Sequence, residues 1–147
     1  MININISSIP TGISDQCFQW VIRKEEYEFF NEDLYIKGEF RVNNIHKTQI
    51  EFEGRIDFQL ELICDRCLKR FKKNFSEKVL FILKKDYLGD ELDIINFTDY
   101  LCDITDYIKD IVVTSLPVKT LCKEDCKGIC PKCGVNLNDE KCKCNNI

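Results

Sequence analysis

The chain has 147 residues, of which 44% are hydrophobic and 31% charged, as expected for one globular domain or one core with a small appendage. Its formal net charge of −4 and its isoelectric point near 5.1 argue against nucleic-acid binding through bulk positive charge. Its apolar runs are too short to cross a membrane, and the N-terminus lacks a signal-peptide pattern. We therefore expect a cytoplasmic location, where thiols stay reduced.

The first half of the chain shows alternating apolar and polar residues in several places. Ile2, Ile4 and Ile6 alternate with polar neighbours, which predicts an edge strand. Residues 15–31 show no clear period, and we expect a helix or a turn that leads into the sheet. Residues 34–42 alternate again and predict a second strand.

The clearest alternation lies in the middle of the chain. From residue 50 to residue 62 every even position except Gly54 carries a large apolar side chain, and the odd positions are polar or charged. A two-residue period predicts a strand with one buried and one exposed face. A further strand is predicted from Phe71 to Leu83, with Phe71 and Phe75 on its core side. Short segments between these strands predict hairpin turns, one of which exposes His46.

A helix is expected after the strands. Apolar residues recur every three or four positions from Leu101 to Ser115, and Pro117 closes the segment. Thr98 or Thr105 would serve as its N-cap. The apolar stripe is expected to cover the buried face of the sheet. The predicted fold class is therefore α+β, an antiparallel β-meander with a covering helix and a C-terminal zinc-ribbon-like tail.

The C-terminal segment 122–147 has too little apolar surface to fold by burial. Its strongly apolar residues are Ile129, Val135, Leu137 and Ile147. Each contributes roughly 1.5–3 kcal/mol when fully buried, whereas ordering a residue costs on the order of 1.5 kcal/mol. A structural zinc site contributes roughly 10–16 kcal/mol in small domains. We therefore expect the many thiols of this segment to replace a hydrophobic core.

Eight cysteines have the spacing of zinc ligands. They form two C-x2-C pairs, one C-x3-C pair and one C-x-C pair. The simplest assignment gives two structural zinc ions, one bound by Cys64, Cys67, Cys122 and Cys126 and the other by Cys130, Cys133, Cys142 and Cys144. This assignment predicts two domains, a sheet-and-helix domain at 1–120 and a tail domain at 121–147. The first zinc ion would attach the tail domain to the hairpin tip at 64–67.

Other interpretations of the cysteines are possible. A disulfide framework is disfavoured in the cytoplasm. A redox C-x2-C pair normally opens a helix, whereas Cys64 and Cys67 lie between predicted strands. An iron–sulfur cluster also takes four cysteines and stays an alternative to zinc. Cys17 and Cys102 fall outside both sets and are expected to be ordinary buried thiols. With one histidine and closed metal sites, neither hydrolytic chemistry nor a small-molecule substrate is expected.

Charge is unevenly distributed along the chain. Segment 64–73 carries five basic residues against one acidic residue, namely Arg66, Lys69, Arg70, Lys72 and Lys73. These residues are candidates for contacts with RNA phosphates, together with Lys119, Lys123, Lys127, Lys132, Lys141 and Lys143 of the tail. Alternatively, they solvate a small metal site. Segment 86–110 has eight acidic residues against Lys109 and is either a solvated face or a surface for a basic ribosomal protein.

The cysteine segments resemble those of a known family. The residues that carry the resemblance are Cys-Asp-Arg-Cys-Leu at 64–68, Ser-Leu-Pro-Val-Lys at 115–119, and the run from 122 to 138 with the closing Cys-Lys-Cys. They are similar to the bacterial YceD family, the large ribosomal RNA subunit accumulation protein family. The resemblance implies a non-enzymatic role in 23S ribosomal RNA accumulation and large-subunit biogenesis, with ribosomal RNA or a precursor particle as partner. The alternative is a zinc-ribbon adaptor that docks a ribosomal protein or an RNA-processing enzyme.

Overall fold

The computed structural model describes residues 1–28, 30–142 and 144 and divides into two compact units. The first unit consists of Met1–Gln59 and Asn74–Ser115, and the second of Leu60–Lys73 and Leu116–Ile147. The hairpin tip predicted at 64–67 therefore belongs to the same unit as the cysteine-rich tail. In the described part of the chain, no helix combines the length and the apolar character needed to cross a membrane.

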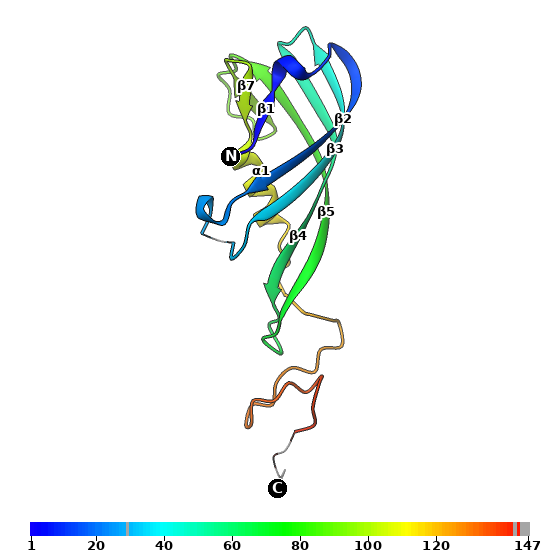
Figure 1. The fold of residues 1–147 in the computed structure, drawn as a ribbon, viewed down its shortest axis with the longest axis vertical. Coiled ribbons are helices and arrows are strands. Elements are labelled where there is room, and N and C mark those ends of the chain that lie inside the picture. The colour runs from blue at the N-terminus through cyan, green and yellow to red at the C-terminus, as the bar shows by residue number, and fades with distance from the viewer. Residues whose placement is uncertain (29, 143, 145–147) are drawn as a thin grey trace. The chain divides into compact units, whose positions relative to one another are not determined.

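The first unit is built on a five-stranded sheet with the strand order β2-β3-β4-β5-β6 (Figure 1). Its strands are β2 (Gly12–Ile22), β3 (Leu34–Ile45), β4 (Gln49–Ile63), β5 (Arg70–Lys85) and β6 (Ile94–Phe97). Strand β3 is antiparallel to both β2 and β4, and β6 is parallel to β5. The expected antiparallel sheet is thus present, and a short parallel strand that the sequence does not predict is added at its edge.

The alternation predicted for the middle strand is confirmed in β4. Its even positions from Ile50 to Leu60 are buried, apart from Gly54, and its odd positions are half-buried or exposed. The buried row packs on aromatic rings of the neighbouring strands. Phe52 and Phe81 stack with their ring centroids 4.7 Å apart. Side chains of the even positions up to Phe58 therefore contribute to the core of the first unit, as the two-residue period predicts.

Gly54 has a structural role in this row. It pairs with Phe40 of β3. A Cβ atom at Gly54 would lie 1.9 Å from the backbone oxygen of Glu39 and 2.8 Å from Cα of Phe40, both shorter than any tolerated contact. The missing side chain therefore allows a close approach of the two strands, which is a common role of glycine in a bent sheet.

Strand β2 corrects the prediction for residues 15–31. It pairs with β3 over its whole length, from Gly12 opposite Asn44 to Ile22 opposite Leu34. The weak alternation of this segment favours a helix or turn, but its pairing with β3 makes its first part a strand. Among the described residues of the predicted interval, which exclude residue 29, only a short 3-10 helix at Lys24–Glu26 is helical.

The two cysteines outside the expected metal sites behave differently. Cys17 lies on an exposed position of β2, so the prediction that it is buried is wrong. Cys102 is buried, as predicted. Burial and the neighbouring Asp103 carboxylate raise the pKa of the Cys102 thiol to about 11.

The N-terminal strand exists, but in a different sheet from the expected one. Strand β1 (Asn3–Asn5) pairs antiparallel with β7 (Leu101–Asp103) in a separate two-stranded sheet. A 3-10 helix at Ile6–Ser8 follows β1. The isoleucines at positions 2, 4 and 6 are buried, as their alternation predicts. Because residues 101–103 form β7, the predicted start of the helix at Leu101 is wrong.

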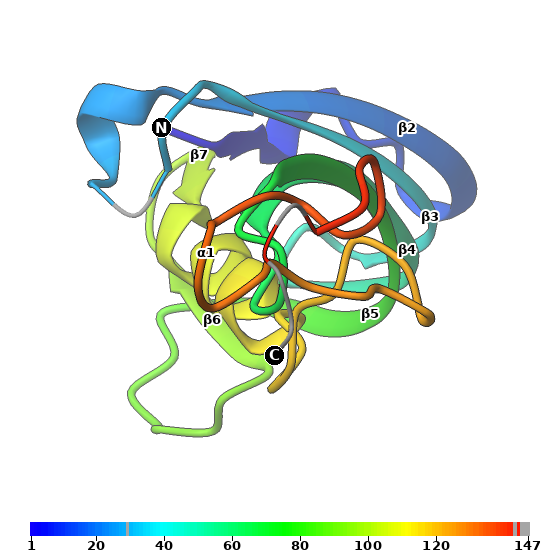
Figure 2. The same cartoon turned by 90° about the horizontal axis from the view of Figure 1, so that it is seen from below.

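Helix α1 (Thr105–Thr114) is the one α-helix among the described residues. Its N-cap residue is Ile104, so neither threonine proposed as N-cap takes that position. Ile108 and Val112 are buried, and the ring of Tyr107 lies 5.2 Å from that of Phe81 on β5. Figure 2 shows strands β2 to β5 curving around α1. The helix therefore covers the apolar face of the sheet, as expected.

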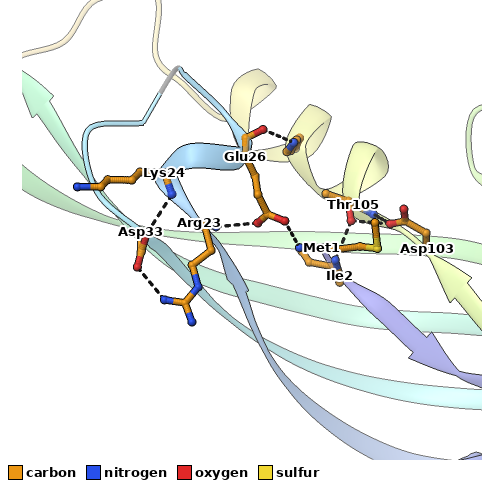
Figure 3. Close-up of polar contacts among 9 residues, drawn as sticks. Met1, Ile2, Arg23, Lys24, Glu26, Asp33, Asp103 and Thr105 are labelled. Atoms are coloured by element: carbon orange, nitrogen blue, oxygen red, sulfur yellow. Dashed lines mark hydrogen bonds and ion pairs between the residues drawn. The ribbon is translucent and has the colours of Figure 1, made fainter.

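A buried threonine joins the start of α1 to the N-terminal strand (Figure 3). The backbone N–H of Ile2 donates to Oγ1 of Thr105 at 2.7 Å, and this hydroxyl donates to Oδ1 of Asp103 at 2.5 Å. The Asp103 carboxylate also accepts the backbone N–H of Thr105 at 2.9 Å. Asp103 thereby satisfies a donor at the open end of the helix.

Glu26 contacts three other residues of the first unit, Met1, Arg23 and Lys109 (Figure 3). Its carboxylate accepts the backbone N–H of Arg23 at 2.9 Å and forms an ion pair with the amino group of Met1. Its backbone oxygen accepts from Nζ of Lys109 at 3.1 Å. The hydrogen bond from the Met1 amino group lowers the pKa of the Glu26 carboxyl.

Candidate metal centres

Eight cysteines of the second unit form two clusters. The first cysteine group is Cys64, Cys67, Cys122 and Cys126, and the second cysteine group is Cys130, Cys133, Cys142 and Cys144. Within each group the four sulfur atoms lie within 4.8 Å of one another. All ten cysteines of the chain are free thiols. The two groups contain the same residues as the two sets formed from sequence spacing.

The sulfur separations suit a tetrahedral metal ion. Bonds of about 2.3 Å to zinc place neighbouring sulfurs roughly 3.8 Å apart. In the first cysteine group the sulfurs of Cys64 and Cys126 are 3.6 Å apart, as are those of Cys67 and Cys122. In the second group the sulfur of Cys142 lies 3.3 Å from that of Cys130 and 3.8 Å from that of Cys133, and the sulfurs of Cys130 and Cys144 are 4.0 Å apart. Both groups could therefore hold a metal ion, and their all-thiolate donor sets are compatible with zinc.

The thiols of the first cysteine group differ in pKa. Burial opposes ionisation of Cys64, but the backbone N–H groups of Cys67, Cys122 and Arg66 together lower its pKa to about 6. Burial and then the neighbouring Cys67 thiol raise the pKa of Cys122 to about 12. Like charges at these separations repel one another. A bound cation is what allows all four sulfurs to ionise together.

The second cysteine group has the same electrostatic pattern. The backbone N–H groups of Cys133 and Lys132 lower the pKa of the Cys130 thiol to about 6. Hydrogen bonding with Cys142 raises the pKa of the Cys144 thiol to about 12. In each group, backbone N–H groups thus favour the thiolate form of one sulfur, and a neighbouring sulfur stays protonated until a cation binds.

A similar backbone turn presents the C-x2-C pair of each group. The N–H of Leu68 donates to the carbonyl oxygen of Cys64 at 2.9 Å, and the N–H of Gly134 donates to that of Cys130 at 2.9 Å. Both residues have positive φ, 61° at Leu68 and 75° at Gly134. In such a turn the backbone N–H groups that follow the first cysteine point toward its sulfur.

Hydrogen bonds hold the tail against the hairpin tip within the second unit. Asp65 and Thr120 exchange two bonds of 2.8 Å, one from each backbone N–H. The guanidinium of Arg66 donates to the carbonyl oxygen of Cys126 at 3.0 Å. A Cβ atom at Gly128 would lie 3.3 Å from the Arg66 carbonyl oxygen, and Gly128 has a φ of 78°. The tail loop therefore follows the hairpin closely, and Arg66 positions one cysteine of the first group.

Asn138 supports the same cysteine from the other side. Its amide Nδ2 donates to the sulfur of Cys126 at 3.3 Å, and its Oδ1 accepts the backbone N–H of Lys127 at 2.9 Å. The hydrogen bond from Asn138 lowers the pKa of the Cys126 thiol. The sequence does not predict this contact, and its one signal is the pair of asparagines, Asn136 and Asn138, between the cysteine pairs of the second group.

A small apolar shell surrounds the first cysteine group. Cys64, Cys67 and Cys126 are buried, and Phe71, Leu121 and Ile129 pack against them. Phe71 is partly buried and Phe75 is buried, which confirms that both rings take part in packing. No comparable apolar cluster surrounds the second group among the described residues, and Cys133 is exposed.

The five basic residues predicted to bind RNA all lie in the second unit, and we call them the basic hairpin. They are Arg66, Lys69, Arg70, Lys72 and Lys73, and all five are exposed. Arg66 is engaged with Cys126, and Arg70 pairs with Glu61 at 3.2 Å. The ammonium groups of Lys69 and Lys72 have no ion-pair partner among the described residues. Of the tail lysines, Lys143 lies outside the described residues.

The two units carry opposite charge. The second unit has eleven Lys and Arg residues against six Asp and Glu, a formal charge of +5 with neutral thiols. The first unit has ten against nineteen, a formal charge of −9. The acidic segment 86–110 lies in the first unit, and two of its leucines, Leu88 and Leu92, are almost fully exposed. The overall acidity of the chain therefore conceals a basic unit.

Sequence comparison identifies the family. The family described as large ribosomal RNA subunit accumulation protein YceD matches residues 52–147, which include all eight clustered cysteines and the basic hairpin. The chain belongs to the YceD family. The family is described as an accumulation factor for the RNA of the large ribosomal subunit, and this description names no reaction.

Individual relatives match shorter stretches. A stretch of 42 residues, 29% of this chain, is 45% identical to the chloroplastic large ribosomal RNA subunit accumulation protein YCED homolog 1 of Arabidopsis thaliana and covers 13% of that protein. A stretch of 82 residues, 52% of this chain, is 36% identical to an uncharacterized protein of Mycobacterium tuberculosis and covers 40% of it. The chain thus spans less than half the length of these relatives. No solved structure matches the chain.

Proposed function

We propose that this protein is a non-enzymatic factor that promotes accumulation of 23S ribosomal RNA and biogenesis of the large ribosomal subunit. In this proposal the protein acts in the cytoplasm and touches ribosomal RNA or a precursor particle directly. The observation that carries the proposal is the concentration of exposed basic side chains on a hairpin that also supplies half of a candidate metal centre. Family membership points to the same RNA.

Two structural zinc ions complete the second unit in this proposal. Each cysteine group binds one ion through four thiolates, and zinc supplies the folding free energy that the scarce apolar residues of the tail cannot. With four protein ligands the coordination shell is closed, so the ion has no position for a reacting water. The zinc-ribbon-like tail and the meander hairpin tip are then one binding module, held in a fixed geometry.

The basic hairpin would contact RNA through its phosphates. Lys69 and Lys72 are the best candidates because their ammonium groups are exposed and not used in ion pairs of the described residues. Each phosphate that is neutralised by a basic side chain releases counterions, so affinity must fall as salt rises. Such contacts orient the protein on RNA without reading its sequence.

Charge reversal at these two lysines tests the proposal. Lys69→Glu with Lys72→Glu should weaken binding to transcripts of 23S ribosomal RNA. It should also reduce the slope of log affinity against log salt concentration by the amount that about two phosphate contacts contribute. Zinc content and thermal unfolding should not change, since neither side chain contacts a cysteine among the described residues and the Lys69 carbonyl oxygen that accepts the Cys64 N–H is kept in the variant. Lys78→Glu, an exposed lysine of the first unit, is the matched control. If the double variant binds like the wild type at every salt concentration, the basic hairpin is only a solvated surface.

One observation favours a second function, a zinc-ribbon adaptor that docks a ribosomal protein or an RNA-processing enzyme. The segment 86–93 has four acidic residues and no basic one, and Leu88 and Leu92 in it are almost fully exposed. Exposed apolar side chains in an acidic segment suit a basic protein partner. Recovery of a partner after nuclease treatment, abolished by Leu88→Ser with Leu92→Ser, would favour the adaptor over the RNA-binding factor.

A further inference from the structure

The two C-x2-C turns are similar in backbone but differ at one residue. In the first turn the backbone N–H of Cys64 donates to the carbonyl oxygen of Lys69, and the N–H of Leu68 donates to the carbonyl oxygen of Cys64, both at 2.9 Å. In the second turn the corresponding bonds are made by Cys130 and Gly134, again at 2.9 Å. Leu68 and Gly134 therefore hold equivalent positions, directly after the second cysteine of each turn.

Leucine is a poor choice for this position. The φ of Leu68 is 61° and that of Gly134 is 75°, in the left-handed region where glycine is not strained and a bulky side chain is. A Cβ atom at Gly134 would meet nothing within 4 Å, so the position points into open space. The leucine side chain is 60% exposed and is not among the residues that pack on the first cysteine group. Burial therefore does not explain why leucine stands there.

The surroundings of Leu68 indicate what it contacts. Its sequence neighbours Arg66, Lys69 and Arg70 are exposed and positively charged. No acidic residue occurs from position 66 to position 73. A partner that suits an apolar side chain beside exposed positive charges presents an apolar surface beside negative charges. The face of an unpaired RNA base between backbone phosphates has this arrangement.

We propose that Leu68 is the apolar contact of an RNA-binding tip and packs against an unpaired base. The basic hairpin takes the flanking phosphates, and the left-handed turn holds the leucine out of the second unit so that it reaches the base. Apolar side chains that pack on or between bases are an established means of nucleic-acid recognition. This inference rests on the proposed function, and it adds a preference for single-stranded or bulged RNA over a continuous duplex.

Leu68→Gly is the decisive variant because it removes the side chain and relieves the backbone at the same time. The test uses the full zinc-loaded chain, with a labelled single-stranded RNA and a fully paired duplex of equal length as probes. We expect Leu68→Gly to keep two zinc equivalents and an unchanged or higher unfolding midpoint. Affinity for the single strand should fall about tenfold, near the lower end of the range for aromatic side chains that stack on bases. The salt slope should stay that of the wild type, because no phosphate contact is lost.

Leu68→Met and the lysine variants separate the possible outcomes. Leu68→Met keeps an apolar side chain and should retain most of the affinity. If Leu68→Gly binds the single strand as wild type does while Lys69→Glu with Lys72→Glu does not, the leucine proposal is wrong and the proposed function stands. If neither variant changes RNA binding, both are wrong. Three further results would overturn the role of Leu68. They are a loss of zinc from Leu68→Gly, a loss of duplex affinity as large as the loss of single-strand affinity, and a binding defect that appears only with a protein partner after nuclease treatment.

Discussion

The side-chain amide of Asn138 donates a hydrogen bond to the sulfur of Cys126 across 3.3 Å. Cys126 belongs to the first cysteine group, whereas Asn138 lies between the two cysteine pairs of the second group. The last part of the tail thus stabilises the thiolate form of a candidate ligand that belongs to the other group. Contacts of this kind orient a ligand and increase the affinity of its metal site.

Removal of this amide should weaken the first metal site selectively. We expect Asn138→Ala to lower zinc affinity at the first cysteine group by roughly 10–100-fold, the usual effect of losing a hydrogen bond to a ligand. The affinity of the second group should change much less, since Asn138 makes no hydrogen bond to its sulfurs among the described residues. Competition with a chelator would resolve the two sites. Asp139→Ala, an exposed neighbour, is the control, and equal zinc release from the control and Asn138→Ala would contradict the prediction.

Metal content should report the two groups independently. Protein purified without added metal should contain about two equivalents of zinc per chain, because each group offers four thiolates. Cys64→Ser and Cys130→Ser should each retain one equivalent. Only Cys64→Ser should accelerate hydrogen exchange at the backbone amides of Asp65 and Thr120, which bond the hairpin to the tail. Only this variant removes a ligand from the cysteine group that joins the hairpin and the tail. A single equivalent in the wild type, or an iron–sulfur absorption band, would refute the assignment.

A single methyl group at Gly54 should destabilise the first unit. The added Cβ would overlap the Glu39 carbonyl oxygen at 1.9 Å, and backbone atoms cannot rotate away as a side chain can. Gly54→Ala should therefore lower the free energy of unfolding by about 1–3 kcal/mol or more. Urea titration monitored by Trp20 fluorescence measures this change. Glu53→Ala, an exposed neighbour on the same strand, should have little effect, and a Gly54→Ala midpoint equal to that of Glu53→Ala would show that the strands adapt.

The buried thiol of Cys102 predicts a loss of stability at alkaline pH. Its folded-state pKa of about 11 lies above the ordinary thiol value of 9.0, chiefly because of burial. The unfolded chain therefore releases this proton first, and stability falls between about pH 9 and pH 11. In Cys102→Ala the decline over this interval should be smaller. Urea unfolding at pH 8, 9, 10 and 11 gives the comparison, and parallel curves for the two proteins would show that Cys102 does not contribute.

The sequence predicts the middle of the sheet well because β4 has a strict two-residue period. It does not predict β2, because the inward positions Ser14 and Gln16 are polar and the outward position Ile13 is apolar, which hides the alternation. Strands β6 and β7 have four and three residues, too few for any period to show. Because β7 pairs with β1, which is distant in sequence, residues 101–103 form a strand and not the predicted start of the helix.

The members of the cysteine groups follow from spacing because adjacent pairs are short and metal geometry is strict. The supporting contacts do not follow, since they depend on how the tail folds back on the hairpin. Arg66 is an example. Its charge suggests a phosphate contact, but in the structure its guanidinium is bonded to the carbonyl oxygen of Cys126. Likewise, the positive φ of Leu68 has no sequence signal, because leucine is not a residue that indicates a left-handed turn.

The sequence distance within the first cysteine group determines the order of events during synthesis. Cys67 and Cys122 are 55 positions apart, so a ribosome that adds about 5–20 residues per second produces the second thiol roughly 3–11 s after the first. During this interval the hairpin has only half of its ligands. Strand β1 also lacks its partner during the first part of this interval, since Asn3 pairs with Asp103, which is synthesised before Cys122. A nascent chain of this protein therefore exposes the thiols of Cys64 and Cys67 to competing metals and oxidants until Cys122 and Cys126 have been synthesised.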